Sequence, residues 1–576
     1  MDSPARYSRR DALRTLGAAG ALSALDSRRF RPESTRLPLP QNAAPVTHGD
    51  QLEAGAVARN DASVLALLAS QITDRDSPWR GSIADQFGLH SAGSAGGAAE
   101  TLTAAVVHPG SAFHGDGALV ERIRLAAGFL ERSQSPQGNI DLLSTNFNSP
   151  PDTGFVVHGV ATAAAIGRRH GRGDITEILR PFLVKAGGAM AAGGIHTPNH
   201  RWVVSSALAQ VNELFPDPRF VRRIDAWLAE GIDIDRDGQF TERSTLVYNV
   251  VCDRALVVLA SKLHRPDLLE PVRRNLRALQ YLLHADGEVV TEISRRQDQF
   301  TRGGVDGYWF PLTYLALNDQ DGRLSTLAAR SAPAGARLSA LLEYPDLLQP
   351  LPAAQPLPDN FEKPFPDVGI ARIRRGPLSA TLVLGGFSRF FTLRHGDAVV
   401  DGVRFATSFF GKGQFIPDAG EKTAAGYTLR QVLEAPYYQP LGKIVTAETW
   451  SAARAQRRQT EVCRLEQSAH VVETAHGFKL RVRSSGTSGV PLAIEICFRE
   501  GGRLEGCRPI AAAPGSFLLE DGTGIYRAGR SEIRFSPGAA PHQYTQVRGA
   551  EAKLPGLSVY LTGYTPFDRT IAFECA

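Results

Sequence analysis

The chain has few of the residues and motifs that several common chemistries require. Only five of its 576 residues are cysteine, and none of them forms a C-x-x-C pair. Because five is an odd number, a disulfide framework that uses every cysteine is excluded. The sequence also has no G-x-S-x-G nucleophile elbow, no phosphate-binding loop and no dinucleotide fingerprint. These absences argue against α/β-hydrolases, P-loop enzymes and Rossmann oxidoreductases.

A large excess of charge is also missing. The chain has 64 basic and 59 acidic residues, and the formal net charge of +5 is spread along its length. This mild excess does not indicate a nucleic-acid partner, and it fits an acidic ligand and an ordinary soluble protein equally well. No segment is a transmembrane candidate, so no membrane partner is expected.

Residues 1–30 are expected to form an export signal. Ser-Arg-Arg-Asp-Ala-Leu-Arg at 8–14 resembles a twin-arginine signal, and an apolar stretch from Leu16 to Leu25 follows it. About ten apolar residues are too few to span a bilayer but suit a signal peptide. We therefore expect a protein exported in folded form to the periplasm or the medium, with a linker at 31–49. A disordered basic tail is the alternative.

Apolar periodicity divides the rest of the chain into two regions. Residues 50–347 show apolar side chains at steps of three and four, which predicts about ten to twelve helices in antiparallel pairs. One such helix carries Val203, Val204, Ala207, Leu208, Val211 and Leu214. A proline-rich junction follows at 348–363, and residues 364–576 then alternate with a period of two. We therefore expect an antiparallel β-sandwich after the helical domain, and a ligand site at the junction of the two domains.

Three side chains in the helical region suit acid–base chemistry. Asn199 and His200 open a predicted helix after a glycine- and proline-containing loop, and Tyr248 lies near the start of another helix. An amide, an imidazole and a phenol are suited to abstracting a proton beside a carboxylate and to protonating a leaving oxygen. The alternative is that Asn199 is merely an N-cap and His200 a surface residue.

Further candidates lie in other loops. We expect His395, at the end of an apolar strand, to project from the β domain towards the helical domain. The amides of Asn146 and Asn148 lie in a polar loop before an apolar helix, where such groups contact sugars. Arg296 and Tyr308 are expected to add a basic and aromatic wall. Ordinary capping residues and a solvated run of charges are the alternatives.

Two patterns that suggest metal ligands fail on closer inspection. His196 and His200 are four residues apart, but Pro198 between them argues against a shared helix face. The acidic segment that starts at Asp233 resembles the beginning of a calcium loop, yet its twelfth position is Ser244 and not glutamate. No metal site is predicted from either pattern.

The order of helical region, proline-rich junction and β region resembles the heparinase II/III-like polysaccharide lyases. Through Asn199-His200, Tyr248 and His395 the chain is most similar to the alginate and oligoalginate lyase pattern. The resemblance covers residues 50 to 575. It implies an α+β multidomain fold, with an N-terminal incomplete (α/α) toroid followed by a C-terminal antiparallel β-sandwich. It also implies β-elimination on a uronate-containing glycan, which leaves a 4,5-unsaturated uronate end.

The resemblance implies a role for each matching residue. Asn199 and His200 would hold and neutralise the uronate carboxylate, and Tyr248 would protonate the leaving O4 and is able to abstract the C5 proton. His200 or His395 would be the base on the opposite face. A phenol ionises near pH 10 in water, so a base role needs nearby cations, for which Arg201 and Arg243 are the candidates. Both arginines are also expected to bind the substrate, where either could add a charge-assisted bond to the uronate carboxylate.

The chain departs from the family pattern at one place. These lyases often show His-Gly-His before Asp-Pro-Gly, and the second histidine supports a structural zinc. Here Asp397 replaces that histidine, and Asp-Ala-Gly stands at Asp418. We therefore predict no cofactor, do not assume alginate as the substrate, and expect an acidic polysaccharide or oligosaccharide as partner. The oligomeric state is left open.

Two other functions remain open at this point. A glycoside hydrolase needs two carboxylates about 5 to 9.5 Å apart, which Asp152, Asp233, Glu242 and Asp298 could supply. A non-catalytic glycan-binding protein is the second alternative, against which the set of Asn199, His200 and Tyr248 argues.

Overall fold

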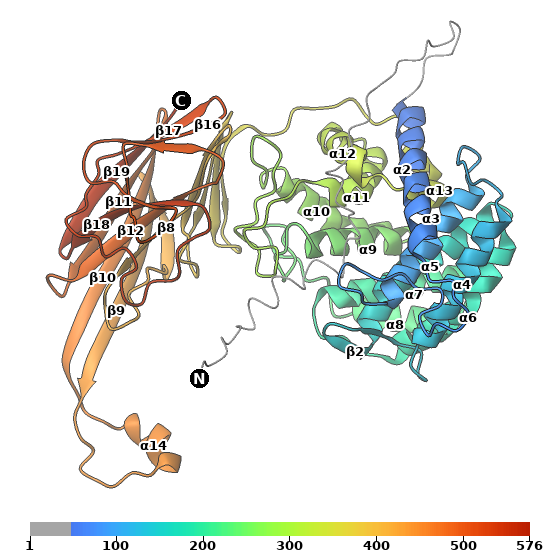
Figure 1. The fold of residues 1–576 in the computed structure, drawn as a ribbon, viewed down its shortest axis with the longest axis horizontal. Coiled ribbons are helices and arrows are strands. Elements are labelled where there is room, and N and C mark those ends of the chain that lie inside the picture. Colours follow the sequence, from blue (N-terminus) through green and yellow to red (C-terminus); the bar gives the residue numbers. More distant parts are fainter. Residues whose placement is uncertain (1–47) are drawn as a thin grey trace, which may run out of the picture. The chain divides into compact units, whose positions relative to one another are not determined.

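The computed structural model describes residues 48–576 and divides them between two units (Figure 1). The first unit ends at Leu357 but leaves out a short segment, Tyr281–Gly287, which belongs to the second unit together with Pro358–Ala576. The change of unit falls inside the proline-rich junction. The predicted export signal, and the predicted linker except its last two residues, lie outside the described residues. No described helix is long and apolar enough to cross a membrane.

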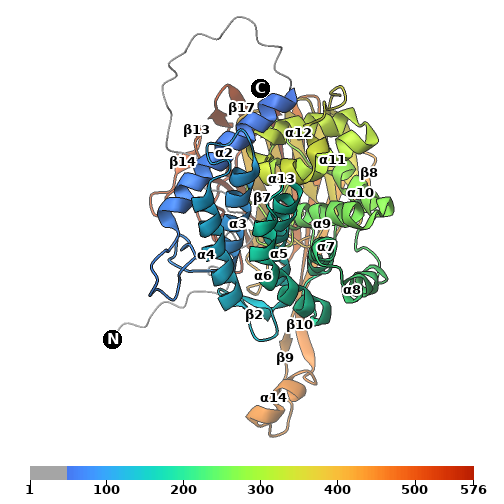
Figure 2. The same cartoon turned by 90° about the vertical axis from the view of Figure 1, so that its right-hand side faces the viewer.

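The first unit is built from helix pairs. Helices α3, α5, α7 and α9 contact one another in sequence order, and each packs against the helix that follows it (Figure 2). This arrangement is an incomplete (α/α) toroid, which confirms the predicted fold of this region. Within the described residues its α-helices are α2 His48–Ser70, α3 Ala92–Val107, α4 Gly117–Ser133, α5 Pro150–Arg169, α6 Gly173–Ala192, α7 Asn199–Leu214, α8 Pro218–Leu228, α9 Tyr248–Leu263, α10 Leu269–Leu279, α11 Trp309–Asp319, α12 Gly322–Gly335 and α13 Leu338–Glu343.

Small residues allow the inner helices to approach one another. A Cβ on Gly96 of α3 would lie 3.0 Å from Val156 of α5, and one on Gly154 of α5 would lie 3.2 Å from Val203 of α7. Larger side chains there would overpack the contacts. Helix α7 is consequently buried on nearly all sides, as expected for a central helix. Its six periodic apolar residues are at most 7% exposed, which confirms the predicted helical period.

Helix α5 begins where the sequence supplies a strong start signal. The hydroxyl of Ser149 accepts a hydrogen bond from the amide of Asp152, and two prolines occupy the first two helical positions. Proline is favourable there because its missing N–H would have no partner inside the helix. The cap therefore fixes the N-terminal end of α5, where Phe155 lies.

The second unit is a β-sandwich. A nine-stranded sheet has the order β14-β15-β18-β12-β7-β6-β5-β4-β3, and an eight-stranded sheet has the order β13-β16-β17-β19-β11-β10-β9-β8. All strand pairs are antiparallel except β15 with β18. The strands of the first sheet are β3 Asn360–Phe365, β4 Ile370–Arg375, β5 Leu378–Val383, β6 Phe391–His395, β7 Ala398–Thr407, β12 Pro491–Phe498, β14 Arg508–Pro509, β15 Ser516–Leu518 and β18 Leu557–Tyr564.

Alternating side chains of the two sheets form one core. Phe391 of the first sheet contacts Phe478 and Phe573 of the second, at ring distances of 5.4 and 5.9 Å. Leu480 and Val482 face the same core, so the predicted sandwich is confirmed. The second sheet contains β8 Ala419–Thr423, β9 Gly426–Tyr438, β10 Gln459–Thr474, β11 Gly477–Gly486, β13 Arg503–Glu505, β16 Gly524–Ala528, β17 Ser531–Ser536 and β19 Phe567–Cys575, with helix α14 Ala447–Arg454 between β9 and β10.

The segment Tyr281–Gly287 joins the second unit through buried polar contacts. The guanidinium of Arg372, which is fully buried, donates to the carbonyls of Tyr281 and Leu283 at 3.4 and 3.3 Å. The ring Nδ1 of His284 lies 3.0 Å from the hydroxyl of Ser379. Nothing in the apolar periodicity of the sequence indicated this excursion.

We predict that His158 makes the helical unit sensitive to acid. Burial, and then the charge of Arg254, lower the pKa of His158 to about 3. An unfolded histidine takes up its proton near pH 6.5, so falling pH favours unfolding from about pH 6.5 down to about pH 3. In His158→Gln the unfolding free energy should depend less steeply on pH, by up to about one proton. Urea unfolding at several pH values measures this slope. His170→Gln, at an exposed position, is the control, and an unchanged slope in His158→Gln would refute the prediction.

Candidate active site

Asn199 is a buried residue at the start of α7. Its side-chain amide donates to Glu242 at 2.7 Å and to the Thr197 hydroxyl at 3.2 Å, and its backbone N–H donates to the same Glu242 oxygen at 3.3 Å. The helix begins at Asn199 itself, without a side-chain cap, and Asn199 and His200 are 1% and 6% exposed. The alternative of an N-cap beside a surface histidine is therefore wrong.

His200 is a neutral imidazole in an aromatic environment. Its ring contacts His196 at 4.6 Å and Phe155 at 6.1 Å, both edge to face. Burial, and then the charges of His196 and Arg296, lower the pKa of His200 to about 3. The ring therefore stays uncharged at neutral pH, when it is able to donate one hydrogen bond and accept another.

Tyr248 is the first residue of α9, and a buried carboxylate fixes the loop before it. The Ser244 hydroxyl accepts from the Tyr248 amide at 3.0 Å and donates to Asp298 at 2.9 Å. Asp298 also accepts from the Leu246 amide and the Ser294 hydroxyl, both at 3.0 Å. Asp298 therefore joins the start of α9 to the loop that contains Arg296.

That loop places a cation and an amide against the phenol. The Arg296 guanidinium lies 4.7 Å from the centre of the Tyr248 ring and donates to its hydroxyl at 3.4 Å, while Gln297 donates to the hydroxyl at 3.2 Å. A second nitrogen of Arg296 lies 3.9 Å from Glu242. Tyr248, Arg296, Glu242 and Asn199 thus form a continuous polar chain across the starts of α9 and α7. Helix N-termini favour negative charge, so this is a suitable place for an anion.

Three buried polar atoms of this cluster have no hydrogen-bond partner among the residues that the structure describes. They are Oδ1 of Asn199, Nδ1 of His200 and Oε2 of Glu242. Because buried polar groups are normally paired, such atoms indicate a place for water or a polar ligand. Sequence reasoning considered Glu242 only as a hydrolase carboxylate and missed Gln297. The closeness of Glu242 to Tyr248 in the chain was the one available signal.

The structure gives Asn146 and Asn148 local partners. Both lie in β2 (Asn146–Ser149), which pairs with β1 (Ile140–Leu142) before α5. The Asn146 amide donates to Asp152 at 2.9 Å, and Asn148 has a left-handed backbone whose N–H donates to Asp141 at 2.6 Å. Their contact with a glycan stays a prediction. Phe147 between them is 70% exposed.

Arg201 and Tyr308 lie where the expected substrate contact does not fit. Arg201 is ion-paired to Asp233 at 2.9 Å, and Tyr308 is 1% exposed and donates to the Thr245 carbonyl at 2.6 Å. Their polar groups are thus used within the protein, so we assign them structural roles instead. Arg243 is half-buried with a left-handed backbone, and its role in binding stays a prediction.

His395 belongs to the other unit. It ends β6, where it pairs with Leu378 and Ala398, and its Nδ1 is buried with no hydrogen-bond partner in residues 48–576. Its expected part in catalysis stays a prediction. In the same residues, no group of three or more histidine, cysteine, aspartate or glutamate side chains is placed to hold a metal ion.

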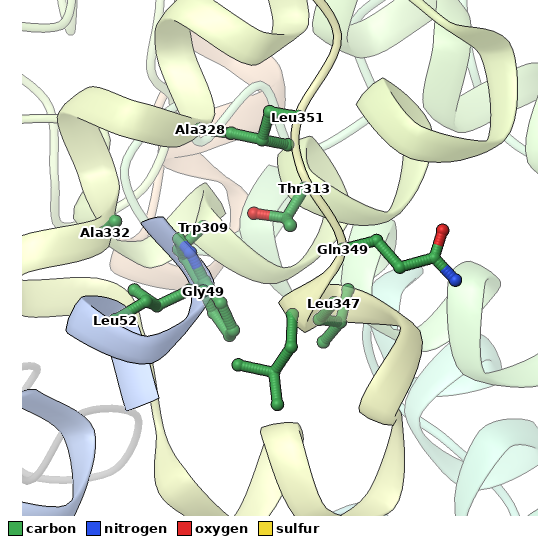
Figure 3. Close-up of a pocket in the computed structure, with 10 residues that line it drawn as sticks. Gly49, Leu52, Trp309, Thr313, Ala328, Ala332, Leu347, Gln349 and Leu351 are labelled. Carbon is green, nitrogen blue, oxygen red and sulfur yellow. The ribbon is translucent and has the colours of Figure 1, made fainter. Parts of the chain in front are cut away.

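A small pocket elsewhere in the helical unit does not compete with this cluster. It lies among α2, α11, α12 and residues 347–351, and Leu52, Trp309 and Leu347 are in its wall (Figure 3). Its free volume is about 10 Å³, roughly what one water molecule requires. A sugar ring does not fit there.

Comparison with solved structures shows that the fold is similar to those of two polysaccharide lyases. The chondroitin AC lyase of Streptomyces coelicolor A3, solved with chondroitin sulphate, has a TM-score of 0.53 at 14% identity, over 93% of this chain and 81% of that chain. Heparinase III has a TM-score of 0.50 at 12% identity, over 94% and 85%. No family model and no curated protein sequence matches the chain. At such identities the likeness shows a shared fold.

We predict that Asp298 is required to hold the start of α9. Asp298→Ala should lower the free energy of unfolding by about 3 kcal/mol, because two buried hydroxyls and the partly buried Leu246 amide lose their charged acceptor. Asp267→Ala is the control, since that carboxylate is 62% exposed and pairs with the nearby Arg265, a contact worth less than about 1 kcal/mol. Denaturant unfolding measures both changes. Equal stability of the two variants would contradict this role of Asp298.

Proposed function

We propose that this protein is a polysaccharide lyase that cleaves a uronate-containing glycan by β-elimination and leaves a 4,5-unsaturated uronate end. The observation that carries the proposal is the Tyr248 hydroxyl held by Arg296, in one polar chain with Glu242 and Asn199 and beside the neutral His200. A phenol next to a cation suits proton transfer at an oxygen, and the fold is one that solved lyases share.

The positive charge for the uronate carboxylate comes from Arg296 in this proposal. Arg201 is occupied by Asp233, whereas Arg296 is one-third exposed and has a long contact to Glu242. The two side-chain amide hydrogens of Asn199 already bond to Glu242 and Thr197. A uronate carboxylate therefore either shares one of these donors or displaces its present acceptor. His200 donates a neutral hydrogen bond. Withdrawing charge from the carboxylate acidifies the C5 proton, most strongly away from water.

The proposed elimination moves one proton to a base and one to the leaving oxygen. The base removes the C5 proton, the electron pair of that bond forms the C4–C5 double bond, and the C4–O4 bond breaks. Tyr248 donates its proton to O4, and Arg296 beside the hydroxyl stabilises the phenolate that results. No water is added to the glycan, so the masses of the two products add up to the mass of the substrate.

The low pKa of His200 bears on the choice of base. A group that holds a proton only near pH 3 is a weak acceptor at neutral pH, so we assign His200 to binding. Proton abstraction then falls to Tyr248, as phenolate, on one face of the sugar, or to His395 on the other. His395→Ala separates these cases, since it abolishes turnover only if His395 is the base.

A retaining or inverting hydrolase has less support. All four of its candidate carboxylates already accept structural contacts, since Asp152 binds Ser149 and Asn146, Asp233 binds Arg201, Asp298 binds Ser244 and Ser294, and Glu242 binds Asn199. The required pair of carboxylates would therefore have to come from groups that these contacts already engage.

We also propose export through the twin-arginine segment at 8–14. An extracytoplasmic enzyme meets polysaccharides directly, which agrees with the proposed substrate. A fusion of residues 1–30 to a reporter that folds in the cytoplasm would test export, with Arg9→Lys/Arg10→Lys as the control that should abolish it.

We predict that Tyr248→Phe lowers turnover by about 100-fold or more, the scale of acid–base catalysis. The variant keeps the ring under Arg296 and loses only the hydroxyl, so the unfolding free energy should change little. Turnover is measured from the ultraviolet absorbance of the new double bond on a panel of uronate glycans. Tyr544→Phe, at a half-exposed position of the second unit, should behave as wild type. Wild-type turnover in Tyr248→Phe would remove this residue from the mechanism.

Reducing the uronate carboxyl of the best substrate to an alcohol should abolish cleavage. The reduced glycan keeps its ring hydroxyls but has no charge for Arg296 to neutralise, so its C5 proton is not acidified. Product is followed by absorbance and, independently, by new reducing ends. Reducing ends without absorbance would show hydrolysis and overturn the lyase proposal.

A further inference from the structure

The hairpin of β9 and β10 extends past its neighbours in the sheet. Pairing of β8 with β9 stops at Arg430, and pairing of β11 with β10 stops at Leu465. Residues 434–464, here called the arm, therefore pair with one another and with no further strand among the described residues, and they carry α14 at their end (Figure 1). Such a projection needs an explanation, because exposed hairpins with few neighbours are poorly stabilised.

The root of the arm is held firmly and presents aromatic rings. Phe409, Ala435 and Leu465 form a separate small core. The next residue, Phe410, has a φ of 49° and is 49% exposed, a strained backbone for a bulky side chain. Its ring lies 5.6 Å from that of Tyr437, which is 56% exposed. An aromatic pair is thus exposed at the surface beside the root of the arm.

The tip of the arm, residues 439–458, is basic. It contains four basic residues, Lys443, Arg454, Arg457 and Arg458, against the single acidic Glu448. Charges lower on the arm are paired, as Arg464 is with Glu434 and Glu466. By contrast, within the described part of the chain no ion pair joins the four cations of the tip to a carboxylate. Arg457 stacks 4.6 Å over Trp450, which is 40% exposed.

We propose that the arm is a second binding site for the acidic polysaccharide, formed by the basic tip with Trp450 and by the Phe410–Tyr437 pair. The choice of ligand rests on the proposed function. Arginine forms paired hydrogen bonds with carboxylate and sulfate groups, and exposed aromatic faces pack against the apolar faces of sugars. Unpaired cations and exposed rings on one projection match both features of such a chain. The arm would retain a long substrate between cleavage events.

The test compares two charge reversals of equal size in the Tyr248→Phe background, which leaves the ligand intact. Arg454→Glu/Arg457→Glu/Arg458→Glu changes the tip. Arg277→Glu/Arg323→Glu/Arg330→Glu changes three exposed arginines of α10 and α12. Affinity electrophoresis with long polygalacturonate, alginate and chondroitin sulfate gives each Kd. The tip variant should raise the Kd of at least one polymer by about tenfold or more, and the control should change it less than about twofold.

A second variant with a shortened arm tests the proposal if the tip variant does not fold. The Gln439 amide donates to the Arg458 carbonyl at 2.9 Å, so an Asn-Gly turn can replace residues 440–457 and close the hairpin. It should also raise the Kd, while turnover of short oligosaccharides by the shortened enzyme with Tyr248 intact stays unchanged.

Two results would overturn the proposal: an unchanged Kd in the tip variant, or equal weakening of binding by the two charge reversals. An unchanged Kd can also be accompanied by loss of self-association of the tip variant in light scattering. That combination would make the arm a contact between copies of the chain. If no uronate glycan yields unsaturated product but the tip variant still loses binding, the proposed function fails and the arm site stands.

Discussion

The contact between Glu242 and Asn199 determines the geometry of the candidate site. One buried carboxylate oxygen accepts from both the side chain and the backbone of Asn199, at the first turn of α7. Glu242 lies six positions before Tyr248 in the chain, and its other carboxylate oxygen faces Arg296. The contact therefore links the start of α7, the loop before α9 and the cation beside the phenol. Removing this carboxylate would leave the amide orientation and the placement of Arg296 undefined.

The charged groups of this cluster are not equally available to a ligand. The imidazole is neutral, the carboxylate is occupied, and Arg296 is the cation whose contacts to Tyr248 and Glu242 are both long. An arriving anion is attracted by that arginine and by two helix N-termini. The rigid parts of the site lie on helix ends, and the loop with Arg296 and Gln297 is fixed to them through Asp298.

Much of this architecture was predictable because it depends on periodicity. The buried face of α7 and the alternation of Phe478, Leu480 and Val482 follow from local spacing alone. The hydrogen bond between Asn199 and Glu242 does not follow from local spacing. Nothing in the sequence distinguishes two distant residues that come into contact from two that do not. Arg201 and Tyr308 were predicted to bind the substrate for that reason, whereas Asp233 and the Thr245 carbonyl bind them in the structure. Gln297 was missed because an isolated glutamine carries no sequence signal.

The segment Tyr281–Gly287 makes the chain pass between the units three times: into the β unit, back to the helices, and out again near Leu357. During synthesis this segment leaves the ribosome long before β4 and β5, whose Arg372 and Ser379 bind it. The β unit therefore completes its interior with residues made as part of the helical region. A fragment starting at Pro358 would bury a guanidinium without two of its acceptors, so a single cut in the proline-rich junction does not yield two self-sufficient domains.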